Sequence, residues 1–284
     1  MAAGRPRRRL TAIAAAAALF QASAAAAAVC PIESAFEYLG STVLQSQPHQ
    51  PWLFVTSDKL VDADGAPNAY SPRDLGQGCP HDGVGLDCLD GAGYPDNDWW
   101  PDVLARDPDQ PDRAYVQQDG PFRGYYVSMT SLRNPDYAGV NSPASYVDAA
   151  RIPYLVLPAP FHATEGMGRA GDLGYAFDLE TGRSTPFVIA DEGPVEPLGE
   201  ASIAFWQALT SVAPNARDGS GLPADPVAVV VFPGSGAEAR LGWPLRLSTL
   251  GEAADRLLAG FGGSEALRAC AGLARPTPDA GEGS

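Results

Sequence analysis

Two acidic residues, Asp191 and Glu200, lie nine positions apart, where a strand-like segment gives way to a helix-like one. The apolar run PFVIA leads directly to Asp191, and a short loop with a Gly-Pro turn leads to Glu200, just before the apolar stretch SIAFWQALTSV. This order predicts that both carboxyl groups face one cleft. Such a pair can hydrolyse a glycosidic bond, because one carboxyl protonates the leaving oxygen while the other activates water or attacks the sugar.

The local surroundings predict which carboxyl does which. Burial raises the pKa of a carboxyl group, whereas a helix N-terminus stabilises its ionised form. We therefore expect Asp191, at the end of an apolar strand, to be the proton donor and Glu200 to be the base. Strand alternation should point Glu192 away from Asp191. The residues by themselves leave a structural interpretation open, in which Asp191 accepts backbone N–H groups of the following turn and Glu200 caps the helix.

Four further residues are candidates for binding a substrate. Asp172 begins the preceding strand and either binds substrate or caps a turn. Asp62 and Asp64 lie in SDKLVDADG, which departs from the D-x-D-x-D-G spacing of a calcium loop and lacks the closing Glu. We interpret these two as turn residues able to line a subsite for a cationic substrate. Tyr125 offers a flat ring on which a sugar can stack.

Other chemistries find little support in the sequence. The chain has three histidines (His49, His81 and His162), no C-x-x-C and no H-E-x-x-H, so no metal site is predicted. The G-x-S-x-G motif of serine hydrolases is absent, and the GSG at residues 234–236 is interpreted as a glycine turn after a strand. We therefore expect no cofactor.

Residues 1–28 have the pattern of an export signal, with four arginines before an Ala-rich apolar run. That run is shorter than the ~20 residues that a membrane span needs. We expect a secreted protein with one catalytic domain over residues 29–275 and a flexible tail over residues 276–284, most simply a monomer.

The chain is strongly acidic. Loss of the four N-terminal arginines would lower the formal charge of −15 by four, to −19. Such a charge repels nucleic acid and anionic lipid and attracts a cationic polymer, although acidity alone is also common among soluble secreted proteins.

Four cysteines follow the signal segment: Cys30, Cys79, Cys88 and Cys270. An even number in an exported chain predicts disulfides. Of the three possible pairings we favour Cys79 with Cys88, which closes a short loop, and Cys30 with Cys270, which ties the two ends together.

The elements that must position these residues are mostly strands. Short runs rich in aromatic and β-branched residues, bounded by Gly, Pro or Asp, predict strands. They cover residues 52–56, 125–130, 152–157, 173–177, 186–190 and 227–232. Helices are expected over residues 202–212, about 251–259 and 264–273. Residues 74–118 lack periodicity but contain two cysteines and two tryptophans, which favours an ordered elaboration. The pattern predicts a mainly β, compact barrel with long loops.

The central segment resembles the chitosanases of glycoside hydrolase family 75. In that family a strand ending in A-D-x-G-P is followed by I-G-E-x-S-I-A and a helix, and here residues 190–194 read ADEGP and residues 198–204 read LGEASIA. Further family-like segments are SDKLVDADGAPNAY (57–70), GYYVSMTSL (124–132), YVDAARIPYLVLP (146–158) and VVVFPGSG (229–236).

The resemblance implies an endo-acting, cofactor-independent hydrolase of the β-1,4 bonds of chitosan, which inverts the anomeric carbon and uses Asp191 and Glu200 as its essential carboxyls. Inversion implies carboxyls about 6.5–9.5 Å apart. By analogy the core would be a six-stranded double-psi β-barrel. Two alternatives stay open: an enzyme of the same shape that cleaves peptidoglycan, and a non-catalytic secreted protein that binds polysaccharide or loosens cell walls.

Overall fold

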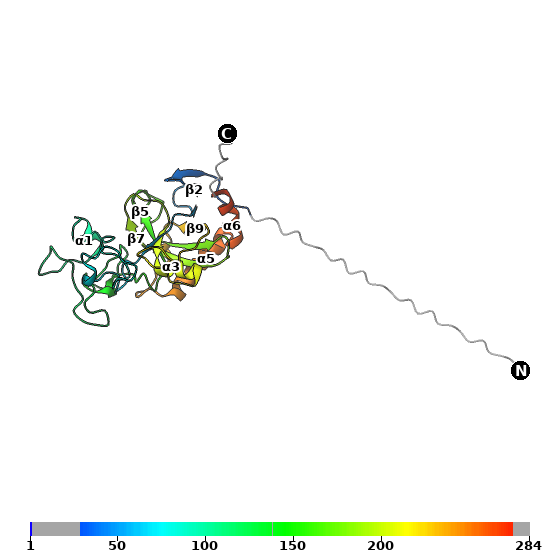
Figure 1. Ribbon diagram of the computed structural model, residues 1–284. Helices are drawn as coiled ribbons and strands as arrows, with labels where there is room; N and C mark the ends of the chain where they lie inside the picture. The colour runs from blue at the N-terminus through cyan, green and yellow to red at the C-terminus, as the bar shows by residue number, and fades with distance from the viewer. Residues whose placement is uncertain (2–28, 138, 275–284) are drawn as a thin grey trace, which may run out of the picture.

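The computed structural model describes residue 1 and residues 29–137 and 139–274 (Figure 1). The predicted export signal and the predicted C-terminal tail therefore fall on residues outside the described part of the chain. None of the helices in the described part has the length and apolar character of a membrane span.

The described residues form one mixed sheet of nine strands, and the protein is mostly β. The strands are β1 (Ala35–Tyr38), β2 (Ser41–Gln45), β3 (Trp52–Thr56), β4 (Leu60–Asp62), β5 (Tyr154–Pro158), β6 (Leu173–Asp178), β7 (Ser184–Gly193), β8 (Glu200–Ser202) and β9 (Val227–Phe232). Their order is β1-β2-β3-β9-β6-β7-β5-β8-β4. Because β1 and β4 end the sheet without pairing with each other, the sheet is open, and the expected six-stranded double-psi barrel is not confirmed.

Five of the six predicted strands are present, as β3, β5, β6, β7 and β9. The prediction of a strand over residues 125–130 is wrong. Its backbone N–H groups bond to several different segments: Tyr126 donates to the Tyr70 carbonyl and Met129 to that of Val103. Since no single neighbouring segment runs alongside residues 125–130, only isolated β-bridges form there, and no continuous ladder of hydrogen bonds.

Six α-helices lie in the described residues: α1 (Trp100–Val103), α2 (Ala159–His162), α3 (Ile203–Thr210), α4 (Ser235–Ala239), α5 (Leu247–Phe261) and α6 (Gly263–Ala274). The three predicted helices correspond to α3, α5 and α6. The Ser202 hydroxyl accepts a hydrogen bond from Phe205 N–H and so caps α3. The cap is therefore Ser202, and the proposed capping role of Glu200 is wrong.

Between β4 and β5 the chain forms a lobe of loops, residues 63–137 and 139–153, which contains α1 and projects from the sheet on the side away from α6 (Figure 1). Its buried residues Tyr70, Trp100 and Leu104 share one core with Tyr154 of β5. The opposite face of β5 and β7 is covered by α3 instead. The predicted elaboration is thus ordered and packs directly on the sheet.

Both favoured cysteine pairings are confirmed. The Cα atoms of Cys30 and Cys270 lie 4.7 Å apart, and those of Cys79 and Cys88 lie 5.2 Å apart, both within the range of a disulfide. The first pair joins the segment before β1 to α6, and the second closes a loop within the lobe. Two disulfides are compatible with a protein secreted into an oxidising environment.

Candidate active site

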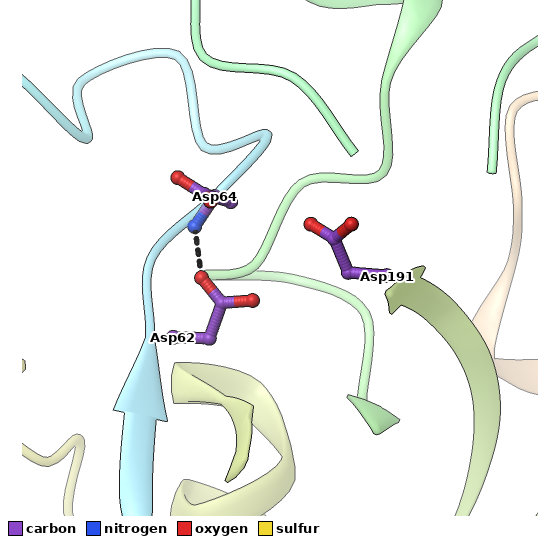
Figure 2. Close-up of side chains that lie close together, drawn as sticks. All are labelled: Asp62, Asp64 and Asp191. Carbon is purple, nitrogen blue, oxygen red and sulfur yellow. Dashed lines mark hydrogen bonds between the residues drawn. The ribbon is translucent and has the colours of Figure 1, made fainter. Parts of the chain in front are cut away.

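Three carboxylates meet where the lobe packs on the sheet. Asp62 is the last residue of β4, Asp64 lies two residues beyond it, and Asp191 lies near the end of β7. One carboxylate oxygen from each lies within 4.8 Å of the others. Figure 2 shows the side chains of Asp62 and Asp191 approaching each other from these two strands. The two residues interpreted from sequence as lining a subsite therefore lie beside the predicted catalytic aspartate.

A bulge in β7 places Asp191 in this cluster. On β7, Phe187 and Ile189 pack on the side of α3, whereas Val188 and Ala190 pack on the side of the lobe. Strict alternation would send Asp191 to the α3 side with Ile189. The pairing with β5 shifts at this point, however: Leu155 lies opposite Ile189 and Val156 opposite Asp191. Ala190 is the extra residue, and the bulge turns the Asp191 side chain to the lobe side.

Parallel pairing of β4 with β8 brings Glu200 to the same region. Asp62 lies opposite Ser202, and Glu200 is two residues before Ser202, so Asp62 and Glu200 share one face of this pair. Strand β5 separates β8 from β7. Asp191 and Glu200 thus stand two strand spacings apart, about 10 Å between backbones, with Asp62 near both.

Hydrogen bonds hold the Asp191 carboxylate in place. Its Oδ1 accepts bonds from Ser131 N–H (3.1 Å), the Ser131 hydroxyl (2.8 Å) and Glu192 N–H (2.8 Å). Ser131 belongs to the lobe, so the interpretation in which Asp191 only serves the following turn is wrong. The described residues offer no hydrogen-bond donor to Oδ2.

Tyrosines and a serine orient the other two aspartates. Asp62 Oδ1 accepts a hydrogen bond from Asp64 N–H (2.7 Å), and the Tyr154 hydroxyl donates to the backbone carbonyl of Asp64 (2.9 Å). Asp64 Oδ1 accepts from the Ser128 hydroxyl (2.8 Å), and the Tyr70 hydroxyl reaches the same carboxylate. Every one of these donors is uncharged, so the negative charges are positioned but not neutralised.

Burial without a cation raises the pKa of the whole group. Burial, then the charge of Asp62, raises the pKa of Asp191 to about 7, against the hydrogen bonds from Ser131 and Glu192. Burial raises the pKa of Asp62 to about 6 and that of Asp64 well above its usual range. Burial, then Asp62, also raises the pKa of Glu200 well above its usual range. Burial and the neighbouring charges thus oppose ionisation of Glu200, whereas its position before the helix led us to expect the ionised form.

Accessibility separates the two predicted catalytic residues from Asp62. Asp62 is buried, with 6 % of its surface exposed, whereas Asp191 and Glu200 keep part of their surface in contact with solvent. No ion pair in the described residues involves any of these acids. Recessed carboxyls that hold protons near neutral pH but remain reachable are suited to exchange protons with a bound substrate.

The structure places the other predicted residues elsewhere. Asp172 is buried, and its carboxylate accepts hydrogen bonds from Arg169 N–H (3.0 Å) and Gly236 N–H (2.9 Å). These bonds correspond to the second role expected for Asp172, that of capping a turn. The Tyr125 hydroxyl lies 3.4 Å from the Val84 carbonyl, and its ring packs on Phe122. Neither residue belongs to the acidic cluster.

Glu192 points away from Asp191, as strand alternation predicts. Its carboxylate lies 3.6 Å from Nδ1 of His162, which belongs to α2.

Sequence reasoning missed three members of the site: Tyr70, Ser131 and Tyr154. Tyr154 carried a usable signal, because a tyrosine inside the apolar run IPYLVL must find a partner for its hydroxyl when it is buried. Ser131 carried none, because it reaches Asp191 only through the packing of the lobe.

No protein-family model matches this chain, and no curated protein matches it. The interpretation of the site therefore depends on its own geometry. Asp62, Asp64 and Asp191 are the one group in the described residues whose spacing could accommodate a cation. Where no cation is bound, burial and mutual repulsion favour protons on these carboxyls.

Replacing Asp191 should change how stability depends on pH. The folded protein keeps a proton on Asp191 up to about pH 7, whereas the unfolded chain releases it near the ordinary value of 3.8. The stabilisation that the protonated Asp191 contributes is therefore complete below pH 3.8 and is lost as pH rises from 3.8 to about 7. We expect Asp191→Asn, measured by calorimetry, to have a Tm that exceeds the wild-type Tm by about 10 °C more at pH 8 than at pH 4.

The exposed Asp109 offers a matched control, since Asp109→Asn removes a charge outside the cluster. An equal Tm difference at both pH values for Asp191→Asn would contradict the raised pKa.

Proposed function

We propose that this chain is a secreted, endo-acting hydrolase of the β-1,4-glucosaminide bonds of chitosan, and a member of the family 75 chitosanases that its central segment resembles. The observation that carries the proposal is the convergence of Asp191 and Glu200 on Asp62, from strands on either side of β5. The reaction as proposed uses proton transfer alone and needs no cofactor.

The surroundings of the two carboxyls favour Glu200 as the proton donor and Asp191 as the base. Glu200 has acidic neighbours that oppose its ionisation. Asp191 accepts three hydrogen bonds on one oxygen, which favour its ionised form, and the other oxygen is available for water. This reverses the roles expected from sequence. Two strand spacings, about 10 Å, separate the backbones of Asp191 and Glu200, and the proposed inversion requires the carboxyl groups themselves to lie about 6.5–9.5 Å apart.

The acidic surroundings also fit a cationic substrate. Each deacetylated sugar carries an ammonium group, and a nearby ammonium stabilises an ionised carboxylate such as Asp62 or Asp64. A chain of formal charge −15 adds a long-range field that attracts the polymer. A neutral polysaccharide would leave these acids uncompensated.

We also propose the double-psi arrangement for the core and secretion as a monomer. Two parallel pairs, β4 with β8 and β5 with β7, support the first within an otherwise antiparallel sheet. A crystal structure in which the sheet closes would support it further. The N-terminal sequence of the exported protein and its mass in solution test the second.

A digestion of fully deacetylated chitosan tests the activity. We expect short glucosamine oligomers by mass spectrometry, a rapid fall in polymer viscosity, and the α-anomer as the first product in NMR spectra. Lysis of wall sacculi without chitosan cleavage would favour the peptidoglycan alternative, and binding of chitosan without product would favour the non-catalytic one. Either result would refute the proposal.

A further inference from the structure

We propose that Glu196 is a positioning residue that holds the acidic proton of Glu200 in place by accepting it in a hydrogen bond. The inference rests on the proposed function, and it adds to the site a residue that the motif around Asp191 and Glu200 does not include. Glu196 lies in the loop that joins β7 to β8, four residues before Glu200.

The contact between the two carboxyl groups requires a proton. The side chain of Glu200 lies within hydrogen-bonding reach of that of Glu196. Two ionised carboxylates have no proton to share, so the bond exists only when one of them is protonated. Glu196 Oε1 is buried, and the described residues offer it no donor. A proton on Glu200 supplies a donor to the Glu196 carboxylate, which the described residues otherwise leave with a costly unsatisfied oxygen.

The backbone fixes the position of Glu196. Its carbonyl accepts a hydrogen bond of 2.8 Å from the Tyr38 hydroxyl, and the Tyr38 ring packs edge-on against Phe161, with ring centroids 4.8 Å apart. The Glu196 side chain folds back over Gly193, where a Cβ atom would collide with Oε1. The β1–β2 hairpin and the Gly193 position thus hold the carboxylate against Glu200.

The charges around Glu200 all favour its protonated form. Asp62 and Asp64 face it from β4 and the following turn, and Glu196 faces it from its own loop. The uncharged Tyr38 faces Glu196 from the hairpin. Burial, then Asp62, then the bond to and charge of Glu196 raise the pKa of Glu200.

The proton has a defined course in the proposed reaction. When substrate binds, the leaving glycosidic oxygen replaces Glu196 as acceptor, and Glu200 transfers its proton as the C–O bond breaks. The attacking water forms the new C–O bond at the anomeric carbon and loses a proton to Asp191, which later releases that proton to solvent. Glu200 then carries a negative charge beside that of Glu196, and this repulsion favours rapid uptake of a new proton from solvent.

The pH profile of Glu196→Gln tests this role. Glutamine keeps the shape and an acceptor oxygen but removes the charge, so the pKa of Glu200 should fall. We expect the basic limb of the kcat profile on chitosan to move by about 1 pH unit to lower pH, with KM changed less than about twofold. The matched control is Glu192→Gln, which removes a charge near the end of β7, where Glu192 faces His162. The control should leave the basic limb in place.

A titration of the Glu200 carboxyl carbon by NMR separates this inference from the proposed function. It needs no substrate, so a wild-type protein that is inactive on chitosan refutes the function and still permits the test. A midpoint about 1 pH unit lower in Glu196→Gln than in wild type supports the inference. An unchanged midpoint, or an equal fall in Glu192→Gln, overturns it.

A second variant keeps the test valid if Glu196→Gln does not fold. Tyr38→Phe removes only the hydroxyl that holds the Glu196 carbonyl. It should lower the Glu200 midpoint in the same direction by a smaller amount. No change in Tyr38→Phe would then overturn the inference.

Discussion

Glu200→Gln should lower kcat on chitosan about a thousandfold, with KM changed only a few-fold. Glutamine has the size of glutamate but carries no acidic proton for the leaving oxygen. Its other interactions are kept, because the backbone of Glu200 still pairs with Leu60 of β4. The loss therefore falls on the chemical step, and initial rates of reducing-end release over a range of chitosan concentrations measure it.

The exposed Glu180, in the turn between β6 and β7, supplies the control. Glu180→Gln removes the same charge from the protein and should keep the wild-type kcat within about twofold, since distant surface changes have small effects. A Glu200→Gln protein that folds and retains the wild-type rate would exclude Glu200 as the proton donor.

Arg217→Met should destabilise the protein by about 3–5 kcal/mol, the cost of leaving a buried charge without its partner. Arg217 and Asp74 form an ion pair of 2.6 Å, and their side chains are only 2 % and 1 % exposed. The guanidinium also donates to the carbonyls of Pro80, Gly85 and Asp87. Removing it leaves an ionised buried carboxylate and three carbonyls without their donor.

These contacts tie the lobe to the segment between α3 and β9. Burial opposes ionisation of Asp74, but hydrogen bonds from Gly85 N–H, Val84 N–H and Arg217 outweigh it and lower the pKa of Asp74. The stability that this group contributes is present above its unfolded pKa and lost as pH falls through the folded value. The defect of Arg217→Met should accordingly be largest at neutral pH and smaller in acid.

Urea unfolding followed by tryptophan fluorescence measures the change. Arg123→Met, an exposed arginine in the same lobe, serves as control and should stay within about 0.5 kcal/mol of wild type. Equal stabilities of the two variants would show that the buried ion pair makes no net contribution to stability, as is the case for some other buried ion pairs.

The sequence was informative wherever a structural preference is local. Strands β3, β5 and β9 are runs of apolar residues buried on both sides, and their composition alone predicts them. Local patterning likewise predicts α3, α5 and α6. The segment at residues 125–130 has the same composition but forms no strand, because a ladder also needs a continuous partner that composition does not report.

For the candidate site, too, the sequence was informative about local features and not about those that depend on tertiary contacts. The residue types and order, together with the family resemblance, predicted Asp191 and Glu200 as a pair. Only the tertiary structure placed Asp62 beside both, because the pairing of β4 with β8 joins segments about 140 residues apart. Only the bulge at Ala190 turned Asp191 to the lobe side, against the alternation that the sequence implies. The protonation of Glu200 depends in turn on these neighbours. A carboxyl's identity is local and readable from sequence, whereas its pKa is set by charges and burial that only folding brings together.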